Sequence, residues 1–285
     1  MEQIKLSNGT LTVTISTMGA EMQSIEKNGC EVLWNGDAAF WTGRAPVLFP
    51  ICGGLRDDKF IFEGKEYTIP KHGYARKTEF LLEKASDTSA TFLLTSNEES
   101  LKKLPFSYEL RITYTLEGDR VRVRYDVTNT GNKTMYFSIG SHEGYACPEG
   151  IEEYSVIFEK EEALSATVLN GNLLEYKANP VPMKGRELPL SYDFFAIDAL
   201  VFADIKSRKA TLLHRPTGRR VTVEFPDRDF LFIWTKPGAP YLCIEPWAGL
   251  PDYVDSDYDI TKKRGIIALP AGKTDTREHR IIMEN

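Results

Sequence analysis

The feature that most constrains the fold is a long alternation of apolar and polar side chains near the middle of the chain. Residues 108–116 alternate, Glu117-Gly118-Asp119 supplies a turn, and residues 121–127 alternate again with arginine or aspartate at every second position. A period of two places alternate side chains on opposite faces of a strand. The segment therefore predicts a β-hairpin with one apolar face and one charged face, whose arginines lie on a solvated sheet surface.

Shorter patterns of the same kind recur along the whole chain, with turn signals between them. Glu63-Gly64 divides one pair of strands, and Pro216-Thr217-Gly218 divides another. No segment keeps a helical period over four turns, and a short helix or turn is expected only at residues 97–104. Many short strands spaced about 8–12 residues apart are typical of a β-sandwich. We therefore predict an all-β protein in which residues 1–285 form a single domain without a linker or repeat.

Charge and cysteine content narrow the class of protein. The net charge of -6 argues against nucleic acid as the main partner. The N-terminal residues lack the apolar run of a signal peptide, and no stretch approaches the roughly 20 apolar residues of a membrane helix. The cysteines are far apart and form no CxxC motif, so we expect free thiols, a cytoplasmic location and no membrane partner; they are Cys30, Cys52, Cys147 and Cys243.

Two histidines occupy positions where a ligand contact is common. His72 follows a strand and precedes Gly73, so it is either near a ligand at a strand end or a surface residue in a turn. His142 follows an apolar strand among small residues, which suits either a concave site or a core histidine bonded to a backbone carbonyl. Ser141-His142-Glu143 cannot be a catalytic triad, because adjacent residues on an extended chain point to opposite faces. There is also no HExxH zinc motif.

Three further charged residues stand in apolar surroundings. Arg44 is the only charge between Asp37 and Arg56, so it either pairs with a buried acid or contacts a ligand. Asp198 and Glu245 each interrupt an apolar run. A buried carboxylate is costly unless it is satisfied, so Glu245 is either a structural group or a catalytic base with a shifted pKa. His214 and His279 have charged neighbours and are expected to be exposed.

Together these residues suggest acid–base chemistry on a polyhydroxylated substrate. A histidine and a glutamate have pKa values that can be tuned toward neutrality, as a general acid and a general base require. Additional histidine, arginine and aspartate side chains can bind hydroxyl groups. Phe, Tyr and Trp make up 11% of the chain and could supply flat faces for sugar rings, although most are expected in the core.

Four motifs occur in an order that resembles the aldose 1-epimerase (galactose mutarotase-like) family. They are Thr42-Gly43-Arg44, Lys71-His72-Gly73-Tyr74-Ala75-Arg76, Ser141-His142-Glu143-Gly144-Tyr145 and Ile244-Glu245-Pro246-Trp247. The resemblance extends over nearly the whole chain. It implies a β-supersandwich of twisted antiparallel sheets that binds a sugar on a concave face and needs no essential cofactor.

The resemblance also implies roles for individual residues. His142 corresponds to the family's general acid and Glu245 to its general base. His72 and Arg44 correspond to substrate-binding residues, and the binding aspartate corresponds to Asp198, with Asp204 as a nearby competitor. The Glu-Pro-Trp and His-Gly-Tyr-Ala-Arg forms resemble the hexose-6-phosphate epimerase-like branch, or an uncharacterised branch often encoded beside sugar-utilisation genes, more than typical galactose mutarotases. In that branch Arg76 becomes a further binding candidate.

The expected function is therefore interconversion of the α and β anomers of a hexose by acid–base ring opening. One alternative is a hexose-6-phosphate 1-epimerase, in which Arg76 and other cations clamp a phosphate. Another is a non-catalytic carbohydrate-binding or sensing protein on the same fold. Glycoside hydrolysis is disfavoured because Glu245 has no obvious carboxylate partner. The expected partner is a small sugar or sugar phosphate, and the chain is expected to be a monomer or homodimer.

Overall fold

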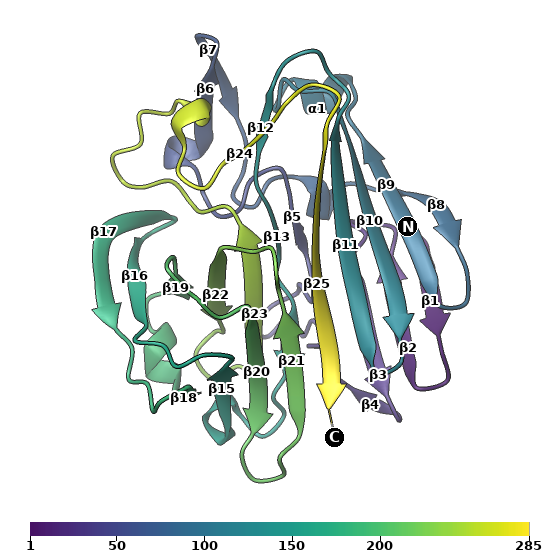
Figure 1. The fold of residues 1–285 in the computed structure, drawn as a ribbon, viewed down its shortest axis with the longest axis vertical. Helices are drawn as coiled ribbons and strands as arrows, with labels where there is room; N and C mark the ends of the chain where they lie inside the picture. The colour runs from purple at the N-terminus through teal and green to yellow at the C-terminus, as the bar shows by residue number, and fades with distance from the viewer. Residues whose placement is uncertain (285) are drawn as a thin grey trace.

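Strands dominate the computed structural model, which describes residues 1–284 (Figure 1). Within that range the only α-helix is α1 (Glu98–Leu101), a single turn begun by Asn97, whose side chain accepts a hydrogen bond from the Ser100 N–H. Both features confirm the expectations of an all-β chain and of one short helix near residue 97. None of the helices formed by residues 1–284 has the length and apolar character needed to cross a membrane.

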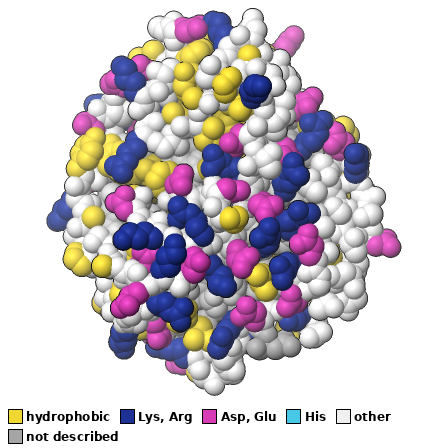
Figure 2. Space-filling view, viewed as in Figure 1, with side chains coloured by type: hydrophobic (Ala, Val, Ile, Leu, Met, Phe, Trp, Pro, Cys, Tyr) yellow, Lys and Arg dark blue, Asp and Glu magenta, His cyan; other side chains and the backbone are white. Residues whose placement is uncertain are grey.

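The larger of the two main sheets has nine strands and contains the long hairpin. Leu116 pairs with Val121 and Leu110 with Val127, as the alternation predicted. Arg124 lies on the outer face beside Asp126, and Figure 2 shows basic and acidic side chains intermingled over this surface. In spatial order the strands are β18 (Glu187–Pro189), β15 (Tyr154–Phe158), β20 (Lys209–His214), β21 (Arg220–Glu224), β25 (Thr274–Glu284), β11 (Arg120–Asn129), β10 (Tyr108–Glu117), β9 (Ser89–Thr95) and β8 (Leu81–Ala85).

The second main sheet has eight strands and carries the Glu245 segment near its centre. Its strands are antiparallel and connect residues that are far apart in the sequence. In spatial order they are β17 (Leu173–Pro180), β16 (Ser165–Asn170), β19 (Leu200–Phe202), β22 (Phe230–Trp234), β23 (Tyr241–Ala248), β13 (Ile139–Ser141) and β5 (Val47–Leu48), and β14 (Gly144–Ala146) also pairs with β23.

Three smaller sheets complete the fold. The N-terminal segment forms a four-stranded meander, and two two-stranded sheets lie at one end of the molecule (Figure 1). The meander contains β1 (Gln3–Ser7), β2 (Leu11–Ser16), β3 (Met22–Lys27) and β4 (Cys30–Glu31), and the two pairs are β6 (Lys59–Phe62) with β7 (Lys65–Thr68) and β12 (Met135–Phe137) with β24 (Ile267–Leu269).

One continuous hydrophobic core joins the two main sheets. Val123 and Val223 of the nine-stranded sheet belong to the same buried cluster as Ile233 and Ile244 of the eight-stranded sheet. Each strand supplies alternate side chains to this cluster, as a sandwich requires. The four cysteines are free thiols, and only Cys30 is exposed.

Two histidines lie deeper than the sequence suggested. His214 and His279 were expected to be exposed, but both are buried, and His279 is fully enclosed. The reason is strand alternation: in β25 the charged neighbours Glu278 and Arg280 point outward, so His279 faces the core with Ile281. There its Nε2 atom lies 3.1 Å from Oε1 of the buried Glu143.

Candidate active site

A cavity of about 470 Å³ opens over strands β22 and β23 of the eight-stranded sheet. It brings together five of the six residues predicted for catalysis or substrate binding, although they come from four distant parts of the chain. These five are His72, Arg76, His142, Asp198 and Glu245. Other lining residues include Trp41, Lys71, Asn172, Phe232, Trp234, Lys236 and Trp247.

Glu245 faces the cavity because side chains along strand β23 alternate between the two faces of the sheet. All eight of its residues are buried, so neither face meets bulk solvent. Leu242 and Ile244 pack into the main core on one face. The intervening residues Cys243, Glu245 and Trp247 therefore share the opposite face, which looks toward the cavity.

His142 is placed opposite Glu245 by the pairing of two strand segments with β23. Gly140 pairs with Trp247, and Gly144 pairs with Cys243 in the same antiparallel register. His142 lies two residues from Gly140 and from Gly144, so in this register it is directly opposite Glu245. Side chains of directly opposed residues lie on the same side of a sheet with Cβ atoms about 4.5–5.5 Å apart.

A proline explains why this ladder is divided into β13 and β14 at the site. Pro246 lies opposite Ser141 in the continued register and has no N–H to donate, so the pairing is interrupted there. The Ile244 N–H donates to the Glu143 carbonyl at 3.3 Å, which makes the adjacent His142–Glu245 pair a non-hydrogen-bonded one. In such pairs the strands approach more closely.

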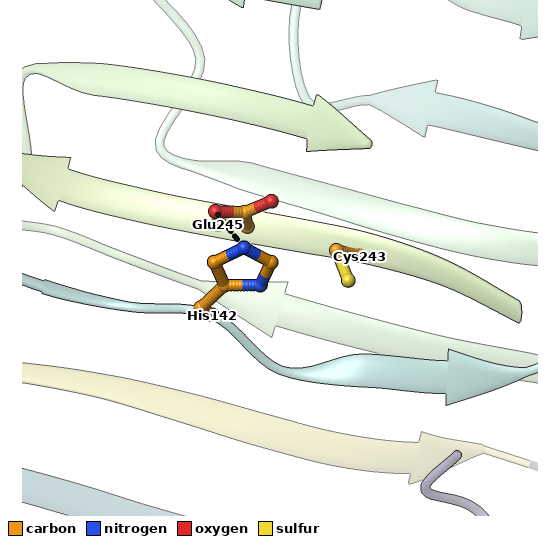
Figure 3. Close-up of side chains that lie close together, drawn as sticks. All are labelled: His142, Cys243 and Glu245. Carbon is orange, nitrogen blue, oxygen red and sulfur yellow. Dashed lines mark ion pairs between the residues drawn. The ribbon is translucent and has the colours of Figure 1, made fainter. Parts of the chain in front are cut away.

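The resulting contact joins the two groups expected to transfer protons. His142 Nε2 lies 3.4 Å from Glu245 Oε2 (Figure 3). Burial is the main cause that lowers the pKa of His142 to about 3. Burial also raises the pKa of Glu245 well above its usual value. Both shifts favour uncharged groups, so they favour a pair that holds one transferable proton on Glu245 beside a neutral imidazole.

His72 is held in a fixed tautomer at the cavity wall. Its Nδ1 accepts a hydrogen bond from the Gly53 N–H at 3.2 Å. Burial, reinforced by nearby His142, holds the pKa of His72 well below its usual value, so the ring is neutral. A neutral ring that accepts at Nδ1 carries its proton on Nε2, which is then free to donate to a hydroxyl group.

The backbone at His72 and Gly73 adopts a left-handed conformation that side-chain-bearing residues rarely take. His72 has φ 67° and Gly73 has φ 68°, both in the left-handed region. A Cβ atom on Gly73 would lie 2.2 Å from the Phe49 carbonyl oxygen. Such conformations persist where the surrounding structure holds them, and they cluster at functional sites.

Aromatic side chains form the floor and walls of the cavity. Trp247 stacks on Phe232 with ring centroids 3.7 Å apart, and its indole N–H donates to the Ser141 carbonyl. Trp41 lies over the His142 ring at 4.9 Å, and Trp234 meets that ring edge-on at 5.5 Å. These rings exclude water from the pair, which strengthens its electrostatic interactions, and they offer flat surfaces for a sugar ring.

Positive charge gathers on one side of the cavity. Lys71 and Arg76 both contribute, after burial, to the lowered pKa of His142, so their charges act on that ring. Arg76 donates from Nη2 to the Lys71 carbonyl at 3.1 Å, while its Nε is buried without a hydrogen-bond partner in residues 1–284. Lys236 lies at the cavity too, and Asp198 adds a carboxylate that accepts from the Ala199 N–H.

The structure does not bring Arg44 to this cavity. The main-chain N–H groups of Arg44 and Ala45 both donate to the Glu21 carboxylate at 2.9 Å. The Arg44 guanidinium donates to the Gln23 carbonyl and packs beside Gly36. Its guanidinium therefore bonds a backbone carbonyl of strand β3, and neither the buried acid nor the ligand considered for it is its partner among residues 1–284. Asp204, the competitor of Asp198, is exposed and lies outside the cavity lining.

Some lining residues escaped the sequence analysis as site components. Lys71 was noted only as one of several basic residues, although its position beside His72 was a usable signal. Trp41 and Trp234 were assigned to the general aromatic content, because a single sequence does not separate a cavity wall from a core. Cys243 is not part of the cavity lining, but strand alternation places it on the same face as Glu245, with its sulfur close to the pair.

Comparison with known proteins extends over almost the entire chain. The family model described as aldose 1-epimerase matches residues 2–276. The plasmid-encoded protein LacX of Lactococcus lactis subsp. lactis is 38% identical over 262 residues, which cover 87% of this chain and 88% of that protein.

Two solved structures from lactobacilli share the fold closely. The galactose mutarotase related enzyme from Lactobacillus acidophilus superimposes with a TM-score of 0.95 at 31% identity, covering 100% of this chain and 98% of that chain. A galactose mutarotase-like protein from Lactobacillus casei gives a TM-score of 0.95 at 30% identity, covering 99% and 100%. These matches confirm the expected fold.

Proposed function

Because the chain belongs to the aldose 1-epimerase family, we propose that it interconverts the α and β anomers of a hexose. The observation that carries this proposal is the buried His142–Glu245 pair, 3.4 Å apart in a cavity that can receive a sugar ring. Retention of a matched acid and base disfavours a purely binding role, because binding alone needs no such pair.

The proposed reaction uses the one proton that the pair shares. When a sugar binds, the proton moves from Glu245 to His142, and the carboxylate then accepts the proton of the anomeric hydroxyl. His142 donates its proton to the ring oxygen, and the C1–O5 bond breaks to give the open-chain aldehyde. Rotation about C1–C2 presents the other carbonyl face, and closure reverses both transfers. The pair ends the cycle with one proton, as it began.

Substrate binding in this scheme depends on the polar groups around the pair. His72 Nε2–H, Asp198 and Arg76 would hydrogen-bond ring hydroxyls and hold most of the sugar while C1 turns. Holding reacting groups in place removes much of the entropic cost of the reaction. Trp247 and Trp41 would pack against the apolar faces of the ring.

The test of the proposal is enzyme-catalysed mutarotation of a panel of free hexoses. Polarimetry follows the optical rotation of a freshly dissolved single anomer, and exchange NMR confirms that the two anomers interconvert without net change. We expect a saturable rate above the spontaneous one. Saturable sugar binding without any turnover would instead support a carbohydrate-binding protein.

The shifted pKa values predict an unusual pH profile. The active form holds one proton on the pair, and a second proton reaches His142 only near its pKa of about 3. We therefore expect kcat/KM to stay level from roughly pH 7 down to about pH 4 and to fall at lower pH. The dependence of kcat/KM on pH is measured from rates corrected for spontaneous mutarotation. Circular dichroism at each pH verifies that the protein stays folded. An acid limb near the ordinary histidine value would contradict the prediction.

A second candidate substrate, a hexose 6-phosphate, is favoured by the two cations Lys71 and Arg76 beside His142. A guanidinium with a buried and unpartnered Nε is well suited to a phosphate, because charge-assisted hydrogen bonds are the stronger ones. The free sugar needs no such charge. The two candidates differ only in substrate and share the His142–Glu245 pair.

Replacing Arg76 by methionine distinguishes these substrates. The change removes the charge but keeps an apolar side chain of similar length. If the phosphate binds Arg76, KM for the 6-phosphate should rise about 10–100-fold, the loss of one charge-assisted contact of roughly 1.5–3 kcal/mol. KM for the free hexose should change much less. Equal losses for both substrates would assign Arg76 to the sugar ring, and Lys236→Met serves as a control for general charge.

A further inference from the structure

One buried thiol lies beside the proton-transfer pair and has no role in the proposed reaction. Cys243 precedes Glu245 by two residues in β23, so both side chains project from the same face. Figure 3 shows them near the imidazole of His142. A ring nitrogen of His142, the Cys243 sulfur and a Glu245 carboxylate oxygen all lie within 4.8 Å of one another.

These three atoms make up a donor set that zinc favours. Zinc binds imidazole nitrogen, thiolate sulfur and carboxylate oxygen at about 2.0–2.3 Å in a tetrahedral arrangement. The three donors would then be roughly 3.3–3.8 Å apart, so side-chain shifts of about 1 Å or less would close the site. Three protein ligands leave the fourth position open to water from the cavity.

An independent feature of His142 also points to a ligand. Its Nδ1 atom is buried and has no hydrogen-bond partner among residues 1–284. Such an atom costs free energy unless something satisfies it. The neighbouring Cys243 is itself fully enclosed, packed with Trp34, Ala239 and Tyr241, so its sulfur is held in place beside the pair.

We propose that His142, Cys243 and Glu245 form a zinc-binding site, and that Zn²⁺ bound there switches off the enzyme. The inhibition, though not the binding, rests on the proposed function. On binding, the Cys243 S–H bond and the Glu245 O–H bond break, a Zn–S and a Zn–O bond form, and both protons pass to solvent. Neutral His142 adds a Zn–N bond through the lone pair of one ring nitrogen and loses no proton. With one ring nitrogen of His142 and one carboxylate oxygen of Glu245 bound to the metal, the pair can no longer pass its proton between the two side chains.

Cobalt absorption tests the binding without any need for turnover. Co²⁺ bound to a thiolate gives an intense ultraviolet charge-transfer band, which Zn²⁺ abolishes by displacement. We expect this band when Co²⁺ is added to the Cys30→Ser variant, which lacks the exposed thiol. The band should vanish in Cys30→Ser/Cys243→Ser and persist in Cys30→Ser/Cys147→Ser, whose changed thiol is buried elsewhere in the core.

Zinc titrations of turnover complete the test. Wild-type turnover should fall as Zn²⁺ is added and recover with a chelator. Cys243→Ser should keep its zinc-free rate and need at least about tenfold more Zn²⁺ for half-inhibition, because a soft thiolate ligand is lost. Cys243→Ala provides the same comparison if the serine variant folds poorly.

The two hypotheses fail in different ways. If no thiolate band forms, or if it survives loss of Cys243, the zinc site is overturned while the proposed function stands. If the band forms as expected but the metal-free protein has no epimerase activity, the proposed function fails while the metal site stands. Turnover that is unaffected by Zn²⁺ at concentrations that displace Co²⁺ and abolish the band overturns the inhibitory role.

Discussion

Replacing Glu245 by glutamine is expected to lower kcat for anomer interconversion by about 10²–10⁴-fold, the usual contribution of one positioned proton-transfer group. The amide keeps the shape of the side chain but can no longer accept the proton of the anomeric hydroxyl. His142→Asn should cause a loss of similar size, because it removes the other half of the pair. Polarimetry with a single anomer measures both rates after subtraction of the spontaneous reaction.

The size of the combined effect is as informative as the single losses. The two groups lie 3.4 Å apart and share one proton, so the double variant should be little worse than either single one. All variants should retain the wild-type circular dichroism spectrum and unfolding midpoint. A rate near wild type in folded Glu245→Gln or His142→Asn would remove the pair from the mechanism.

Replacing Glu143 by leucine is expected to cost about 3–5 kcal/mol of unfolding free energy, which is large against the roughly 5–15 kcal/mol of a typical domain. Glu143 is buried and faces His279, which is fully enclosed in the core. The His279 ring lies 5.8 Å from Tyr125, and the buried Arg228 guanidinium lies over the same tyrosine. Removing one partner leaves the other polar group buried without compensation.

A double variant separates this pairing from a simple loss of packing. Leucine at both Glu143 and His279 removes the polar pair together, so it should restore much of the stability lost in either single variant. Urea unfolding of the four proteins gives the coupling energy directly. Additive losses would contradict a direct interaction, and Glu66→Ala, which breaks an exposed ion pair, should leave the unfolding midpoint nearly unchanged.

The architecture was largely predictable because its signals are local. The hairpin of β10 and β11 follows from alternation and one turn, and both can be seen in twenty consecutive residues. The order of strands in the two sheets was not predictable in this way. β25 inserts between β21 and β11, and nothing in the local sequence of β25 specifies those neighbours.

For the site too, the local sequence identifies individual residues, while their spatial pairing depends on contacts between distant parts of the chain. His142 and Glu245 could each be singled out from their surroundings, but only the strand register makes them partners. Arg44 also stood out as a lone charge, yet the Glu21 carboxylate and the Gln23 carbonyl hold it away from the cavity. The expectation for His279 failed for a different reason: alternation in β25 already indicated burial, and the charged neighbours were given too much weight.

The continuous register between residues 139–145 and strand β23 makes the His142–Glu245 contact depend on the number of residues in this stretch. Because neighbouring residues face opposite ways, deleting or inserting one residue between Gly140 and Gly144 would turn the imidazole into the core and present its neighbour to the cavity. Loops elsewhere can grow or shrink during evolution with little penalty. This short stretch cannot, so if the pair acts as proposed, we expect a homologue whose length differs here to lack the paired geometry even when it keeps both residues.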